Sequence, residues 1–296
     1  MKINKKGRVF LMAMQLCMLL TITSCSSKLA YNNLHWLVGW YVDDYVSLTD
    51  TQEEKFEMVV KSFIAWHRES ELERYIAQIN TIKIDVKSGV TQANIQSYSD
   101  ALRHFMDVAL IKFEPEISTI AYSLTDQQVE AFLFKFEQKN LKRIEEFENA
   151  TNEERLQDRL KKIEARIESF TGELNAEQKG LLEETNKNLL PSFTLWVEFR
   201  QTWADAVRDA YALRRDNNNV EGKDNKDEKL AFRHALKRII LQANSMRSAE
   251  YVEVLTHNQG IWIATMEQLI NSLNNDQFNY FNEELNGIVG DIQDLL

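Results

Sequence analysis

The chain of 296 residues contains only two prolines and nine glycines, the residues on which most turn types depend. A protein of this size built from strands and tight turns needs many more of both. Charged residues make up 27% of the chain and aromatic residues 10%, a composition that excludes an intrinsically disordered protein. The scarcity of turn residues therefore indicates a folded, mainly helical chain with enough length for a sizeable core.

Cysteine is almost absent as well, because only Cys17 and Cys25 occur. Cys17 lies within, and Cys25 directly after, an N-terminal segment that has the features of an export signal. Four basic residues and no acidic residue lie within residues 1–24, and an apolar run follows from Val9 to Ile22. That run is too short to span a membrane comfortably. It ends in Ile22-Thr23-Ser24-Cys25, which resembles the bacterial lipobox.

The lipobox resemblance implies that residues 1–24 are a cleaved lipoprotein signal peptide and that Cys25 carries a covalent lipid such as palmitate. Residues 25–28 would then be the anchor and a short tether. Ser26 stands where an aspartate would retain a lipoprotein in the inner membrane, which implies the periplasmic face of the outer membrane. A secreted protein with one free cysteine is the alternative. In either case a single mature cysteine excludes an intramolecular disulfide and a thiolate metal cluster.

The charge of the mature chain argues against one class of partner. The whole chain has 35 basic and 45 acidic residues, and four of the basic residues lie in the leader, which leaves 31 − 45 = −14. Such a surface repels phosphate backbones, so no nucleic acid is expected to bind.

Residues 29–46 predict a first helix with an aromatic stripe at helical spacing. Its apolar positions include Tyr31, Trp36, Trp40, Tyr41 and Tyr45. Trp and Tyr are typical of a helix lying at a bilayer surface. The other interpretation is a helix that packs in the protein core. Asp43 and Asp44 suit anionic headgroups badly, which favours core packing.

One motif recurs at unequal spacings: Leu, then Thr or Asn, two further residues, Gln, and an apolar residue four positions later. It occurs at Leu48–Gln52, Leu124–Gln128, Leu174–Gln178 and Leu273–Gln277, and less clearly at Leu255–Gln259. The Thr or Asn side chain can cap the first free amides of a helix, and Gln can reach back to the cap. The motif therefore predicts helix starts, as do Thr151 and Glu154, and the unequal spacings exclude a solenoid.

The rest of the chain predicts further helices and one polar loop. A long pattern covers residues 52–86, and the next helix runs from Thr91 to about Phe113, just before Pro115. A mobile polar loop is expected at residues 216–229. No alternating apolar and polar run is long enough for a sheet. The predicted fold is all-α, a multi-helix bundle of mostly antiparallel helices forming a single domain over residues 29–296.

The most unusual local sequence is Trp66-His67-Arg68, followed by Glu71 and Tyr75. It has two interpretations: a candidate binding surface, or an interior polar junction that fixes two helix halves. Arg68 could pair with Glu71 three residues on. A bend near Arg68–Ser70 is one expectation for this segment.

Motifs for catalysis or metal binding are weak. His67 with Glu71 and Asp100 with His104 share helix faces, but neither pair has the two-histidine spacing of a zincin. There is no glycine-rich phosphate loop and no nucleophile elbow. The sequence predicts no enzyme, no metal site and no cofactor beyond the lipid on Cys25, with a metal-binding or catalytic site around His67 as the least favoured alternative.

A larger set of residues carries a family resemblance: Tyr31-Asn32, Trp36, Asp44-Tyr45, Leu48, Gln52, Trp66-His67-Arg68, Glu71-Leu72, Tyr75, Leu124–Gln128, Gly172, Leu174, Gln178, Pro191, Trp196 and Arg200. Together they resemble a family of uncharacterised Gram-negative envelope lipoproteins, up to about residue 205. That resemblance implies a helical fold and an envelope location, and no catalytic residue. Glu73 replaces the proline expected after Glu71-Leu72, which predicts a helix that runs on unbroken.

The Leu-Thr-x-x-Gln motif alone is also similar to that of Spy-type periplasmic chaperones. The expected function is therefore a non-enzymatic structural or protein-interaction role, with an unidentified envelope protein as partner. A periplasmic holdase that binds unfolded clients is the alternative.

Overall fold

The computed structural model describes residues 31–215 and 226–296, and the leader, Cys25 and its tether lie outside these ranges. Within the described residues there are eleven α-helices, one 3-10 turn and no strand, which confirms the all-α prediction. The helices are α3 (Leu34–Asp43), α4 (Asp50–Ser70), α5 (Leu72–Ser88), α6 (Gln92–Ser123), α7 (Asp126–Asn149), α8 (Asn152–Thr171), α9 (Ala176–Asn188), α10 (Phe193–Arg215), α11 (Lys226–Leu241), α12 (Ala249–Asn271) and α13 (Asn275–Gln293), with the 3-10 turn at Ala243–Met246.

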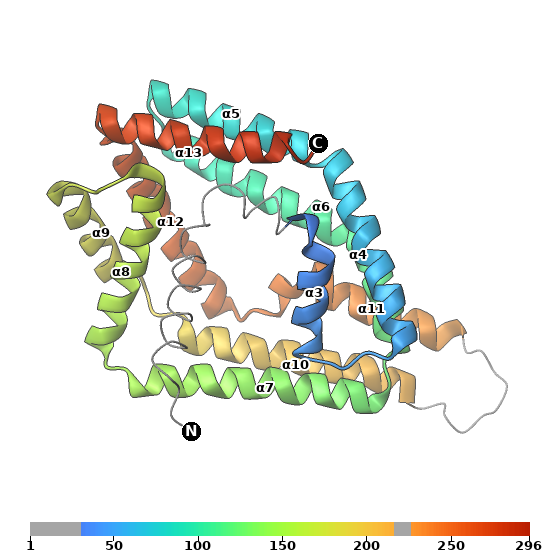
Figure 1. Ribbon diagram of the computed structural model, residues 1–296. Helices are drawn as coiled ribbons and strands as arrows, with labels where there is room; N and C mark the ends of the chain where they lie inside the picture. The colour runs from blue at the N-terminus through green and yellow to red at the C-terminus, as the bar shows by residue number, and fades with distance from the viewer. Residues whose placement is uncertain (1–30, 216–225) are drawn as a thin grey trace, which may run out of the picture.

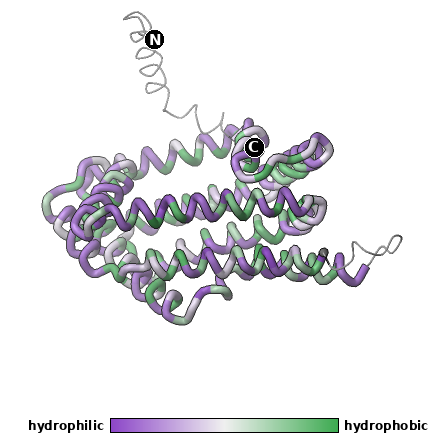
Figure 2. The backbone as a smooth tube through the Cα atoms, turned by 90° about the horizontal axis from the view of Figure 1, so that it is seen from below, coloured by the Kyte–Doolittle hydropathy of each residue, from purple (hydrophilic) through white to green (hydrophobic). Residues whose placement is uncertain are grey.

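The helices lie along the sides of a four-sided frame (Figure 1). Helices α7 and α10 form one side, and α5 with α13 form the opposite side. The long helix α6 packs against α4, α11 and α12 and so connects the remaining sides. Figure 2 shows apolar and polar residues alternating in short stretches along each helix, which is the pattern of helices with one buried face.

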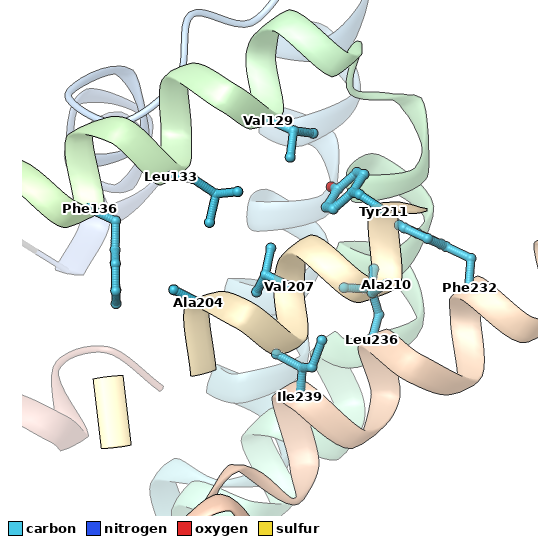
Figure 3. Close-up of a cluster of buried hydrophobic side chains, with 10 residues drawn as sticks. All are labelled: Val129, Leu133, Phe136, Ala204, Val207, Ala210, Tyr211, Phe232, Leu236 and Ile239. Atoms are coloured by element: carbon cyan, nitrogen blue, oxygen red, sulfur yellow. The ribbon is translucent and has the colours of Figure 1, made fainter. Parts of the chain in front are cut away.

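Buried apolar side chains form two separate clusters. The larger cluster lies between α7, α10 and α11 (Figure 3) and contains Val129, Leu133, Phe136, Ala204, Val207, Ala210, Tyr211, Phe232, Leu236 and Ile239. The smaller one contains Leu174, Leu182 and Leu269, with side chains of α8 packed against it. The core is thus divided between two parts of the frame.

Three predictions about helix ends are wrong. The helix that begins after Thr91 continues through Pro115 to Ser123. Before the proline, Phe113 packs against Phe63 of α4, and after it Tyr211 and Arg214 of α10 donate to the Ala121 and Tyr122 carbonyls. The segment after Arg68 does not run on unbroken, since α4 ends at Ser70 and α5 begins at Leu72, which agrees with the alternative expectation of a bend near Arg68–Ser70. Residues 226–229 belong to α11 and not to the predicted loop, whose residues 216–225 lie outside the described ranges.

Two helices end at glycines with positive φ, Gly89 at 89° and Gly172 at 71°. Residues with a Cβ rarely adopt this conformation, so glycine allows the chain to reverse there. No helix in the described part of the chain is both long and apolar enough to cross a membrane.

Candidate functional site

The Trp66-His67-Arg68 block lies at the break between α4 and α5. His67 Nδ1 is 2.9 Å from the hydroxyl of Tyr31, and His67 Nε2 is 2.9 Å from the hydroxyl of Tyr75. A neutral imidazole donates from one nitrogen and accepts at the other. Both nitrogens are therefore used, and the ring connects α4 to α5 and to the chain before α3.

The two charged residues of the block have different partners from those predicted. Arg68 Nη2 donates to Asn32 Oδ1 at 2.9 Å, and the guanidinium lies 5.6 Å from the ring centroid of Tyr31. Glu71 is 1% exposed and forms an ion pair with Arg74 at 3.5 Å. The predicted pair between Arg68 and Glu71 is wrong, because Arg68 is engaged by the segment that precedes α3.

Aromatic side chains surround this junction. The Trp66 ring centroid lies 5.5 Å from that of Phe63, and Lys112 Nζ of α6 lies 5.7 Å from it. On the α5 side, the ring of Tyr75 lies 4.7 Å from Phe105 of α6. The five candidate residues thus occupy a half-buried joint between three helices, with Glu71 fully buried.

Burial shifts the pKa values of the ionisable side chains at this joint. Desolvation lowers the pKa of His67, an effect that the nearby Glu71 carboxylate opposes. Burial raises the pKa values of Tyr31 and Tyr75. The imidazole and both phenols are therefore favoured in their neutral forms. Among the described residues no group of three His, Cys, Asp or Glu side chains could hold a metal ion.

The recurring motif does start helices. In α4, α7, α9 and α13 the cap side chain accepts from the backbone amide of the Gln, and the Gln Oε1 accepts from the amide of the cap. The isolated pair Thr151 and Glu154 does the same for α8. The weaker copy at Leu255–Gln259 lies inside α12 and starts nothing.

The four motifs also join in pairs, which the sequence did not reveal. Gln52 Nε2 lies 3.2 Å from Gln128 Oε1, and Gln128 Nε2 lies 2.7 Å from Gln52 Oε1. Each amide also donates at 2.8 Å to the carbonyl before the partner's leucine, Gln52 to Ser123 and Gln128 to Ser47. We call this reciprocal arrangement of two motif glutamines a clasp.

A second clasp joins the other two motifs. Gln178 Nε2 lies 3.0 Å from Gln277 Oε1, and Gln277 Nε2 lies 2.9 Å from Gln178 Oε1. The carbonyls that accept are again those before the leucines, Ser272 at 3.3 Å and Glu173 at 2.8 Å. In Figure 1 the starts of α4 and α7 meet at one corner of the frame, and those of α9 and α13 lie near the opposite corner.

One sequence feature distinguishes the four paired caps from the cap of α8. All four paired motifs have Gln at the third helical position, whereas the unpaired cap of α8 has Glu154. Either residue can complete a cap, but only an amide can donate to a second motif. Gln at this position therefore permits pairing, whereas Glu does not, but it does not specify a pair, since Gln259 inside α12 joins no other motif.

Helix α3 differs from the prediction that its aromatic residues pack in the core. It packs against α4, yet none of its residues is buried. Trp36 is 64% exposed, Trp40 69% and Tyr41 59%. Core packing is therefore wrong for these three side chains, although the Tyr41 ring lies 5.3 Å from that of Tyr45 and 5.7 Å from Lys139 Nζ of α7.

An apolar pocket of about 230 Å³ lies beside the end of α3, where Val42 and Val46 form part of its wall. The Tyr211 hydroxyl in the wall donates to the Ala121 carbonyl at 2.8 Å, and burial raises its pKa to about 12. No lining residue is charged, so the pocket has room for an apolar group and no charge to orient one. Figure 3 shows five of its lining residues, Val129, Val207, Tyr211, Leu236 and Ile239.

Comparison with known proteins identifies a family and no characterised relative. A family of unknown function, DUF6279, matches residues 44–251, which is 208 of the 296 residues. That span contains the α4–α5 junction, the first clasp and half of the second. No curated protein matches the chain, and no solved structure matches it.

Proposed function

We propose that this chain, which belongs to the DUF6279 family of unknown function, is a lipoprotein of the outer membrane with a structural or protein-binding role in the cell envelope. The observation that carries the proposal is the coincidence, at one end of the chain, of a basic start, an apolar run and the segment Ile22–Cys25. Lipidation of Cys25 would hold the helical frame at the periplasmic face of that membrane.

The contacts of the conspicuous polar residues support a role without catalysis. Both nitrogens of His67 are bonded to tyrosines, and the Glu71 carboxylate is buried against Arg74. The motif glutamines are likewise used to join helices. These groups hold the frame together, which leaves other surfaces of the frame for interaction with a partner.

Substitution of the two cysteines tests the anchor. Cys25→Ser should abolish palmitate labelling in cells and partition into the detergent phase. Cys17→Ser is the matched control and should keep both, because Cys17 lies inside the proposed leader. Continued labelling of the Cys25→Ser protein would overturn the proposal.

A holdase is the second candidate, favoured by an exposed groove with apolar and polar lining residues. The groove lies between α4 and α6, has a volume of about 750 Å³, and includes Met58 and Ile111, which are 62% and 60% exposed. Flexible methionine side chains suit varied apolar clients. The mature protein should then slow aggregation of an unfolded client at a stoichiometric ratio, and Met58→Ser with Ile111→Ser should weaken the effect. No effect of the parent protein would exclude this candidate.

A further inference from the structure

The helix that follows the proposed anchor in the sequence, α3, carries exposed aromatic side chains. Trp36, Trp40 and Tyr41 occupy one side of the helix, and each is more than half exposed. The other four tryptophans of the chain are half-buried in the frame. Large exposed apolar surface is uncommon on soluble proteins unless it contacts something, and Trp and Tyr are the side chains typical of the membrane–water interface.

Two lysines of α7 lie beside the acidic end of α3. Asp44 is paired with Lys135 at 3.0 Å and with Lys139, both on α7. Lys139 Nζ also lies 3.8 Å from the ring centroid of Tyr45. The charges of Asp43, Asp44 and the two lysines sum to zero at this end of α3. Of the two acidic residues that argued against lipid contact, Asp44 is thus compensated by α7.

The position of α3 in the chain places it close to the membrane. Trp36 follows Cys25 by eleven residues, and a chain of that length spans about 40 Å at most. A lipid on Cys25 would therefore keep the first turns of α3 within reach of the leaflet that holds the lipid.

We propose that α3 is a membrane-contacting helix whose Trp36, Trp40 and Tyr41 side chains enter the headgroup region of a zwitterionic phospholipid surface. The lipid anchor and α3 would then form two contacts, which fix the orientation of the frame as well as its attachment. The orientation rests on the proposed lipidation of Cys25, whereas the affinity of α3 for lipid does not. A zwitterionic surface is favoured because the mature chain carries a charge of −14, which anionic lipids would repel.

The test uses the mature chain with Cys25→Ser, which carries no lipid, mixed with phosphatidylcholine vesicles. The protein should float with the vesicles, and Trp36→Ser with Trp40→Ser should reduce the bound fraction at least about tenfold. Leu102→Ser with Met106→Ser is the matched control, because these α6 side chains are 62% and 59% exposed and lie outside α3. The control should bind as the parent does.

A second measurement does not depend on the serine variants folding. Phospholipids brominated near the headgroup should quench the tryptophan fluorescence of the parent, and Trp36→Phe with Trp40→Phe should remove most of that quenching. Binding that is absent in the parent, or that is lost in the α6 control and kept in the α3 variant, overturns the proposal. These results are independent of palmitate labelling, so failure of the α3 contact and failure of the anchor are distinguishable.

Discussion

The glutamines of the clasps use every hydrogen-bonding position of the side-chain amide. Gln178 is 2% exposed, and its Oε1 accepts from the Asn175 amide and from Gln277. Its Nε2 donates to Gln277 and to the Ser272 carbonyl. A buried amide satisfied in this way is specific for its partner, because any other neighbour leaves a polar atom unpaired.

Gln178→Glu should therefore destabilise the protein by about 3 kcal/mol, measured as the free energy of unfolding in urea. The carboxylate still accepts from the cap, but it cannot donate to Gln277 or Ser272. Glu154→Gln is the reverse change in the exposed cap of α8 and should leave the unfolding midpoint nearly unchanged. Equal losses in both variants would show that the clasp contributes no more than a cap.

His67 gives the stability a dependence on pH. Burial lowers its folded-state pKa below the ordinary value of 6.5, so the unfolded chain takes up a proton first as pH falls. The contribution is fully present above the unfolded pKa and is lost as pH falls toward the folded pKa. His67→Gln should flatten the decline in unfolding free energy from about pH 7.5 to about pH 5. An unchanged slope would contradict this assignment.

The ends of α5 and α8 depend on the backbone conformation of a single residue, because each helix ends at a glycine with positive φ. Gly172 has φ of 71° and ψ of −164°, a region almost restricted to glycine. An added Cβ would lie 3.8 Å from the Tyr280 ring, which is an ordinary contact. The constraint on this residue is therefore conformational and not steric.

Gly172→Ala should cost about 1–3 kcal/mol of stability because alanine must adopt that strained conformation. Gly180→Ala is the control, since Gly180 lies within α9 and an added Cβ there meets nothing within 4 Å. It should stabilise the protein by about 0.5–1 kcal/mol. Thermal or urea unfolding of the pair measures both effects, and a stabilising Gly172→Ala would contradict the argument.

The frame as a whole is held by two clasps at opposite corners, each beside its own apolar cluster. Leu174 of the second clasp belongs to the smaller cluster, and Leu124 of the first packs against the larger one. Separation of this kind predicts that the two clasps contribute independently to stability.

Double-mutant cycles test that independence. Gln52→Ala combined with Gln178→Ala should be additive within about 0.5 kcal/mol, because the residues share no partner. Gln178→Ala combined with Gln277→Ala should deviate from additivity by about 0.5–3 kcal/mol, because each change removes the other's partner. Strong coupling between clasps would indicate that the frame unfolds through a shared contact.

Several elements were predictable because their causes are local. The caps at Thr49, Thr125 and Thr151 followed from spacing within one helical turn. The continuation of α6 through Pro115 was not predictable, since it depends on helices that pack on either side. The exposure of Trp36 was also missed, because periodicity places residues on one face without showing what that face meets.

By itself, the sequence determined that this protein is helical and where most of its helices begin, because capping hydrogen bonds join residues three apart. Only the tertiary structure decided which motifs pair, since the clasp partners lie 76 and 99 residues apart. The packing of α3 on α4 likewise decided which of its side chains stay exposed. The cap uses only the glutamine Oε1, as acceptor from the cap amide. The partner of the glutamine Nε2 depends on contacts that form between helices distant in the sequence.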